Sequence, residues 1–215
     1  MNRLLVSLIL LMTATIAPAQ RADVGLVNLV AGDVTYAPAT GAPARAQTFM
    51  KLRDGDRIEV PAGGQVRVVF FEGARQERWT GPASFRAGKS AGEPISGSAA
   101  EVVTLPAGAA QRIGQMPQLV QIAKLGGIQL RGMSPPPKAV ADQQSQVSAA
   151  RAAYAKMRAD LPADDIAPEL YLYAVLNDYS LYGEMKIVAE EMLRKQPGND
   201  DLKQPLVTVN NRRGR

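Results

Sequence analysis

Three arginines and the only tryptophan of the chain lie close together in sequence. Arg67, Arg75 and Arg78 flank Trp79. Arginine presents a rigid fork of donors to anions, and tryptophan presents a flat stacking surface. These four residues are therefore candidates for a face that contacts an anion or a glycan. The alternative is an amphipathic hairpin whose charges stay in water while Trp79 fills the core.

Tyrosines form a second concentration of binding-type side chains. Four of the six lie within twelve residues, at positions 171, 173, 179 and 182. On a single helix, Tyr171 and Tyr182 fall within about 20° of each other, whereas Tyr173 points elsewhere. Tyr171 and Tyr182 are therefore candidates for a ridge that receives a peptide or a partner helix. The alternative is packing within the molecule.

Acidic pairs are the third feature with chemical potential: Asp164-Asp165, Glu190-Glu191 and Asp200-Asp201. Neighbours on a helix point about 100° apart and do not converge on one substrate atom. The Asp54-Gly55-Asp56 turn has only two close carboxylates, fewer than an EF-hand calcium loop. We interpret these acids as helix caps and solvated faces, and we expect no catalytic residue, no bound metal and no cofactor.

Composition narrows the functional classes. The 215 residues include no cysteine and no histidine, which removes disulfides, thiolate nucleophiles and the usual general base. The net charge is +5 and neither half is strongly basic, so we expect no nucleic-acid partner. An enzyme is not expected. A rival hypothesis, a small carboxylate-dependent hydrolase, would need two acidic groups about 5–10 Å apart across a cleft.

The N-terminus has the pattern of a secretory signal. Arg3 supplies the positive charge, Leu4 to Met12 form a short apolar run, and Ala17-Pro18-Ala19 gives a small-x-small cleavage pattern. The apolar stretch is shorter than the roughly 20 residues of a spanning helix, so cleavage is favoured over an uncleaved anchor. We expect a periplasmic protein with no transmembrane segment after removal of residues 1–19.

The remaining chain divides into two textures. Residues 24–105 hold short apolar runs separated by glycine and proline, which predicts about seven strands at the spacing of a β-sandwich. The Gly-, Ala- and Ser-rich segment 87–100 is predicted to be a mobile loop. From residue 147 onward, apolar residues recur at helical spacing. The predicted fold class is α+β with segregated parts, a β-sandwich-like module followed by a small helical segment.

Within the β half, Leu52 to Ile58 (LRDGDRI) and Gly64 to Gly73 (GQVRVVFFEG) resemble the FecR-like domain family, and Gly32-Asp33-Val34 and Gly81-Pro82-Ala83 fit the same layout. The resemblance implies an extracytoplasmic β-rich module that binds a ligand or partner. The namesake regulators carry a cytoplasmic segment and a membrane span, where this chain has its expected leader. Residues 168–197 resemble a single degenerate tetratricopeptide-type helix pair, and a small helical bundle docked on the β-module is the alternative.

The sequence thus predicts a non-enzymatic, exported envelope protein that acts as a binding module or scaffold. Its partner would be an envelope protein or a cell-wall polymer. An accessory role in a transmembrane signalling system is the alternative. The expected segments are a signal peptide (1–19), a FecR-like β domain (20–116), a short helix and Pro-rich linker (117–137), a tetratricopeptide-like helical region (138–204) and a basic disordered tail (205–215).

Overall fold

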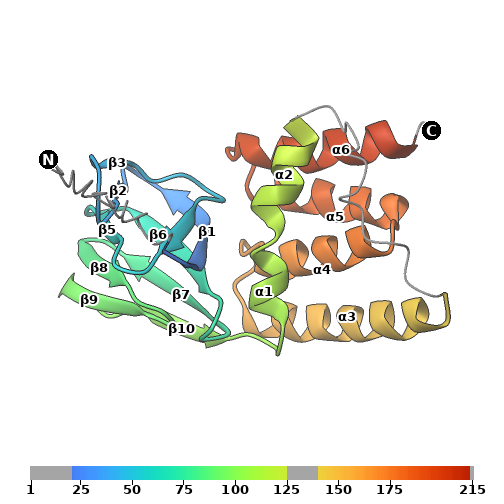
Figure 1. The fold of residues 1–215 in the computed structure, drawn as a ribbon, viewed down its shortest axis with the longest axis horizontal. Coiled ribbons are helices and arrows are strands. Elements are labelled where there is room, and N and C mark those ends of the chain that lie inside the picture. The colour runs from blue at the N-terminus through green and yellow to red at the C-terminus, as the bar shows by residue number, and fades with distance from the viewer. Residues whose placement is uncertain (1–20, 125–139, 214–215) are drawn as a thin grey trace, which may run out of the picture.

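The computed structural model describes residues 21–124 and 140–213. The expected leader and the proline-rich linker lie outside these residues. Among the described residues no helix is long and apolar enough to cross a membrane. The strands come first and the helices follow, which confirms the predicted α+β class (Figure 1).

The β half consists of two antiparallel five-stranded sheets. Sheet A has the order β10-β7-β6-β1-β4, and sheet B has the order β3-β2-β5-β8-β9. The strands are β1 (Asp23–Ala31), β2 (Thr35–Ala37), β3 (Ala44–Arg45), β4 (Lys51–Arg53), β5 (Arg57–Val60), β6 (Gln65–Phe70), β7 (Arg75–Thr80), β8 (Ala83–Ala87), β9 (Gly92–Gly97) and β10 (Glu101–Thr104).

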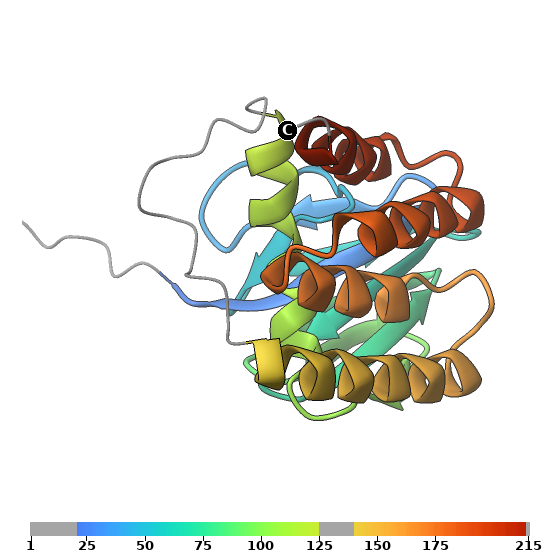
Figure 2. The same cartoon turned by 90° about the vertical axis from the view of Figure 1, so that its right-hand side faces the viewer.

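The helical half forms a layer against sheet A, on the side away from sheet B (Figure 1). Seen from the helical side, α3 to α6 lie side by side across the sheet (Figure 2). The helices are α1 (Ala109–Ile113), α2 (Met116–Lys124), α3 (Val140–Asp160), α4 (Ala167–Asp178), α5 (Tyr182–Lys195), the 3-10 turn η1 (Asp200–Leu202) and α6 (Lys203–Arg213).

Sheet A is the middle of three layers, and its two faces belong to different cores. Val66, Val68 and Phe70 of β6 point into the sandwich between the sheets. Val69, from the same strand, joins the core formed with the helices. Because both faces are covered, β6 is buried along nearly its whole length. In contrast, β5 of sheet B alternates exposed and buried residues, as a strand with one solvated face should.

Helix α3 confirms the predicted apolar stripe. Val147, Ala150, Met157 and Leu161 are buried, and Tyr154 packs against the same core.

The end of the following helix is predicted at Gly183, but Gly183 lies in the first turn of α5. The break instead occurs at Ser180, which follows α4 with a φ of 57°, in the left-handed region.

Three expectations about segments were wrong. The segment 87–100 contains strand β9 rather than only a loop. Residues 203–213 form α6 where a disordered tail was expected from residue 205, and Val209 of that helix is fully buried. Strands end at Thr104 and α1 begins at Ala109, so helical structure starts before the expected boundary at residue 116.

Candidate functional site

The outer face of sheet B carries polar side chains that align across all five strands; four of them are at least partly exposed, and Ser84 is 4% exposed. Because Ile58 and Val60 point inward, Glu59 between them points outward. In the strand register Glu59 lies opposite Thr35 on one side and Ser84 on the other. Thr35 in turn lies opposite Arg45, and Ser84 opposite Ser96. We call these five residues, from Arg45 to Ser96, the polar row.

A second row runs beside the first. Arg57 lies two residues before Glu59 and on the same face, opposite Arg86, and Arg86 lies opposite Glu93 of β9. The Arg57 Nη2 and Glu59 Oε1 atoms are 2.9 Å apart, which ties the rows together. With strands about 4.8 Å apart, the polar row across five strands is roughly 19 Å long.

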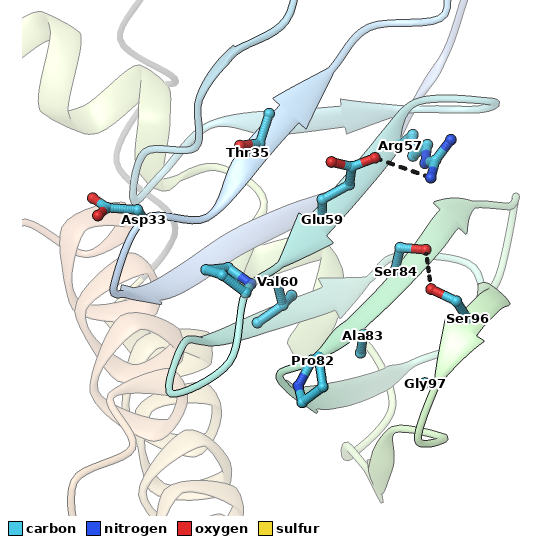
Figure 3. Close-up of a pocket in the computed structure, with 11 residues that line it drawn as sticks. Asp33, Thr35, Arg57, Glu59, Val60, Pro82, Ala83, Ser84, Ser96 and Gly97 are labelled. Atoms are coloured by element: carbon cyan, nitrogen blue, oxygen red, sulfur yellow. Dashed lines mark hydrogen bonds and ion pairs between the residues drawn. The ribbon is translucent and has the colours of Figure 1, made fainter.

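A shallow pocket of about 510 Å³ lies over the polar row (Figure 3). The Ser84 and Ser96 hydroxyls are 2.8 Å apart on one side of it. On the other side Asp33 pairs with Arg45 at 3.1 Å. The lining residues are Asp33, Thr35, Arg57, Glu59, Val60, Pro61, Pro82, Ala83, Ser84, Ser96 and Gly97.

The lining of this pocket combines hydrogen-bonding groups with a larger area of apolar atoms, from residues such as Val60, Pro61 and Pro82. Carboxylates such as Glu59 accept hydrogen bonds, the Arg57 guanidinium donates them, and the serine and threonine hydroxyls do both. No aromatic ring belongs to the lining. Such a mixture of donors and acceptors matches a ligand that is rich in hydroxyl groups.

The arginine-rich hairpin does not form the single face that was predicted. Strand alternation sends Arg67 and Arg78 toward the helical layer and sends Arg75 and Trp79 toward sheet B. Trp79 is 1% exposed and stacks on Phe85 with ring centroids 4.4 Å apart. This placement confirms the alternative in which the tryptophan fills the core, and it removes Trp79 as a contact residue.

Arg67 is also unavailable to a partner, because it is 2% exposed and lies between the two halves of the molecule. Its Nη2 donates to Asp164 Oδ2 at 2.7 Å, and its Nη1 lies 3.7 Å from Asp165 Oδ2. Both aspartates belong to the segment between α3 and α4. The alternative of charges that remain in water is therefore wrong for Arg67.

The other two arginines remain partly exposed. Arg75 donates from Nε and Nη2 to Glu77. Arg78 pairs with Glu101 of β10. Both side chains are about one-third exposed, so each keeps a solvated part, but they lie on opposite faces of β7 and do not converge.

The ion pair of Arg67 is part of a buried polar chain that the sequence did not reveal. Asn28 Nδ2 donates to Gln76 Oε1 at 2.8 Å, and Gln76 Nε2 donates to Asp165. Asp165 is fully buried, and its Oδ1 accepts the backbone N–H of Ala167 at the start of α4 at 2.8 Å. The predicted capping role of Asp165 is wrong in position, because the N-cap residue of α4 is Ile166, which has no side-chain cap bond. The bond from Ala167 to Asp165 instead stabilises the turn just before the helix. The second role of Asp165, as the partner of sheet A, depends on contacts about 90 residues distant in sequence.

Asp164 gives this contact a dependence on pH. Burial raises the pKa of Asp164, but the hydrogen bond from Arg67 and the positive charge of Arg67 together lower it by more. The pKa of Asp164 therefore lies below its ordinary value of 3.8. A depressed pKa stabilises the folded state above the unfolded value and loses that contribution as pH falls. We therefore expect the stability advantage of the native protein over Asp164→Asn to shrink as the pH falls below about 4. Urea unfolding from neutral pH down to about 3 measures this, and a constant advantage would contradict it.

The tyrosine ridge also differs from the expectation. Tyr171 lies on α4 and Tyr182 on α5, so the wheel of one continuous helix does not apply to them. Both pack, partly buried, against the core of the helical layer. Burial raises the pKa of Tyr171. Tyr173 is buried and donates from its hydroxyl to the Pro205 carbonyl at 3.1 Å, which ties α4 to α6.

Among the described residues no group of three or more acidic side chains could hold a metal ion. In the Asp54-Gly55-Asp56 turn, Asp56 is buried and accepts hydrogen bonds from Tyr36, Ala39 and Arg53. Its role in this turn is structural. No family model, no curated protein and no solved structure matches this chain.

Proposed function

We propose that this protein is a non-enzymatic, exported envelope protein that acts as a binding module, and that the outer face of sheet B holds a hydroxyl-rich polymer of the cell wall. The observation that carries the proposal is the polar row. It brings carboxylate, hydroxyl and guanidinium groups from five strands onto one face.

The length and chemistry of that face favour a polymer over a compact ligand. The row is roughly 19 Å long, and the pocket is shallow and open along it. A chain of sugar units could place successive hydroxyls opposite successive strands. The described helices lie on the opposite side of the molecule, and none of them covers this face (Figure 1).

The expected export rests on Arg3, the apolar run after it and the Ala17-Pro18-Ala19 pattern. Determining the N-terminus of the protein isolated from an envelope fraction tests this part separately. A new N-terminus near Gln20 supports export with cleavage. An intact Met1 in the cytosolic fraction contradicts it.

Substituting Glu59 tests the binding face. We expect Glu59→Ala to weaken co-sedimentation with insoluble cell-wall polysaccharide by about tenfold, because hydrogen bonds to a charged group contribute about 1.5–3 kcal/mol. The matched control is Glu184→Ala, since Glu184 is also an exposed glutamate in an ion pair with an arginine, but on α5. Equal retention of the two variants, or no retention of the unaltered protein, would contradict the proposal.

A further inference from the structure

A second pocket, of about 470 Å³, lies where sheet A meets the helical layer. It is separate from the polar row, with which it shares no lining residue. Strand β1, the segment before β4, the α3–α4 segment and the end of α5 all contribute to it. Its lining residues are Leu29, Val30, Thr48, Asp164, Lys195, Gln196, Gly198, Asn199, Asp200 and Asp201.

Negative charge dominates this lining. Asp164, Asp200 and Asp201 contribute three carboxylates from two segments. The C-terminal end of α5, where backbone carbonyls lack helical partners, adds the negative end of a helix dipole. Asp164 is bonded to Arg67, and Asp200 to the exposed Lys203 at 2.6 Å. Each carboxylate can accept further hydrogen bonds beside those pairs.

The one lysine of the lining does not offset these charges. Lys195 Nζ donates to the Ala163 carbonyl at 2.7 Å. It also lies 3.6 Å from Glu169 and 3.7 Å from Glu191, neither of which lines the pocket. Glu169 also pairs with Arg158, and Glu191 with Arg194, so these acids balance only part of the Lys195 charge. The lining still holds three carboxylates against one ammonium, which favours a positively charged ligand.

Gln196 adds an unpartnered hydrogen-bond donor to this site. The residue lines the pocket and is 8% exposed. Its Oε1 accepts a hydrogen bond from Asn199 Nδ2 at 3.1 Å, whereas its Nε2 is buried without a partner among the described residues. A buried donor without an acceptor costs free energy. A ligand with a carbonyl or carboxylate group could provide that acceptor.

The pocket suits an organic cation better than a metal ion. Its acids are not grouped closely enough to hold a metal. Its volume of about 470 Å³ greatly exceeds the space of one water molecule, about 30 Å³ in the liquid. Leu29 and Val30 add apolar atoms along which a hydrocarbon stem could lie.

We propose that this pocket binds a lysine-type residue, a primary ammonium on an aliphatic stem beside a carbonyl group. The ammonium contacts Asp200, Asp201 and Asp164. The stem lies along Leu29 and Val30, and the carbonyl accepts from Gln196 Nε2. Because the lining comes from both halves of the molecule, the ligand bridges sheet A and the helical layer.

Calorimetric titration with Nα-acetyl-lysine amide tests the proposal. We expect saturable one-to-one binding with a Kd of about 1 mM or below. The double variant Asp200→Asn/Asp201→Asn and the single variant Gln196→Met should each weaken binding at least tenfold. Glu190→Gln is the matched control, since Glu190 is an exposed acid on α5 outside the pocket, and it should bind as the unaltered protein does.

Three results would overturn the proposal. The first is no saturation up to about 10 mM probe. The second is equal binding of the norleucine analogue, which lacks the ammonium. The third is unchanged binding in the Asp200→Asn/Asp201→Asn variant with its fold intact by circular dichroism. The Glu59→Ala variant separates this site from the polar row, because it should leave lysine binding unchanged.

Discussion

Replacing Arg67 by alanine is expected to lower the free energy of unfolding by about 3–5 kcal/mol, because removing one partner of a buried ion pair leaves an uncompensated charge. The charge left behind is that of Asp165, which is fully buried and cannot regain water without opening the contact between sheet A and the helices. Urea denaturation followed by circular dichroism measures the loss.

Arg78 provides the control for this experiment. It lies directly opposite Arg67 on the neighbouring strand and shares its face of sheet A. Its ion pair with Glu101 is solvated, so Arg78→Ala should cost about 0–1 kcal/mol. Similar losses in the two variants would contradict the importance of the buried pair. The double variant Arg67→Met/Asp165→Asn should lose less free energy of unfolding than Arg67→Met and Asp165→Asn lose in sum. Each single variant leaves one buried charge unpaired, whereas the double variant removes both charges.

Replacing Glu77 by alanine is expected to have a comparable effect, about 3–5 kcal/mol, through the other face of sheet A. Glu77 is 1% exposed inside the sandwich. Its carboxylate accepts from Arg75 Nε at 2.8 Å, from Trp79 Nε1 at 3.1 Å and from the Gly92 N–H at 3.0 Å. All three donors lose their acceptor in the variant.

The fluorescence of Trp79, the single tryptophan, follows the unfolding of the Glu77 variant directly. Glu93→Ala is its control, since Glu93 is an exposed glutamate of β9, the strand that Glu77 helps to hold. We expect the Glu93 variant to stay within about 0.5 kcal/mol of the native protein. A Glu77→Ala protein as stable as Glu93→Ala would show that the donors find other acceptors.

Local patterns were sufficient to predict the class of the fold and most of its elements. The alternation in β5 and the spacing of Val147, Ala150 and Met157 in α3 each report burial against one neighbour, so they are visible in sequence. Gly55 similarly marks its turn, where it adopts a φ of 87°.

Long-range contacts explain where prediction failed. From its strand pattern alone, Arg67 is expected to be solvated. In the folded protein it pairs with Asp164 and Asp165, which are about 97 residues away in sequence. The glycine content of segment 87–100 predicts a loop, but the segment contains strand β9. Its Gly92 is required by close packing rather than by a turn. A Cβ on Gly92 would lie 2.7 Å from Glu77 Oε2 and 2.8 Å from the Trp79 ring. Neither arrangement leaves a local periodic signal.

The two proposed binding sites could not be predicted from the sequence for a related reason. The polar row depends on the register of strands β2, β3, β5, β8 and β9, and two of these are only two or three residues long. Short strands have little periodicity of their own, and register follows from turns and from packing of the opposite face. Asp164 and Gln196 likewise share a pocket only because the α3–α4 segment folds back beside the end of α5.

The position of sheet A between two cores has a consequence for how the protein can be divided. Cutting the chain between α2 and α3 would leave Leu26, Val69 and Ile113 on a fragment that lacks helices α3 to α6. These side chains would then form an apolar surface exposed to water. Neither fragment is expected to remain monomeric in solution. We therefore expect that neither the β half nor the helical half can be transferred to another protein without the other.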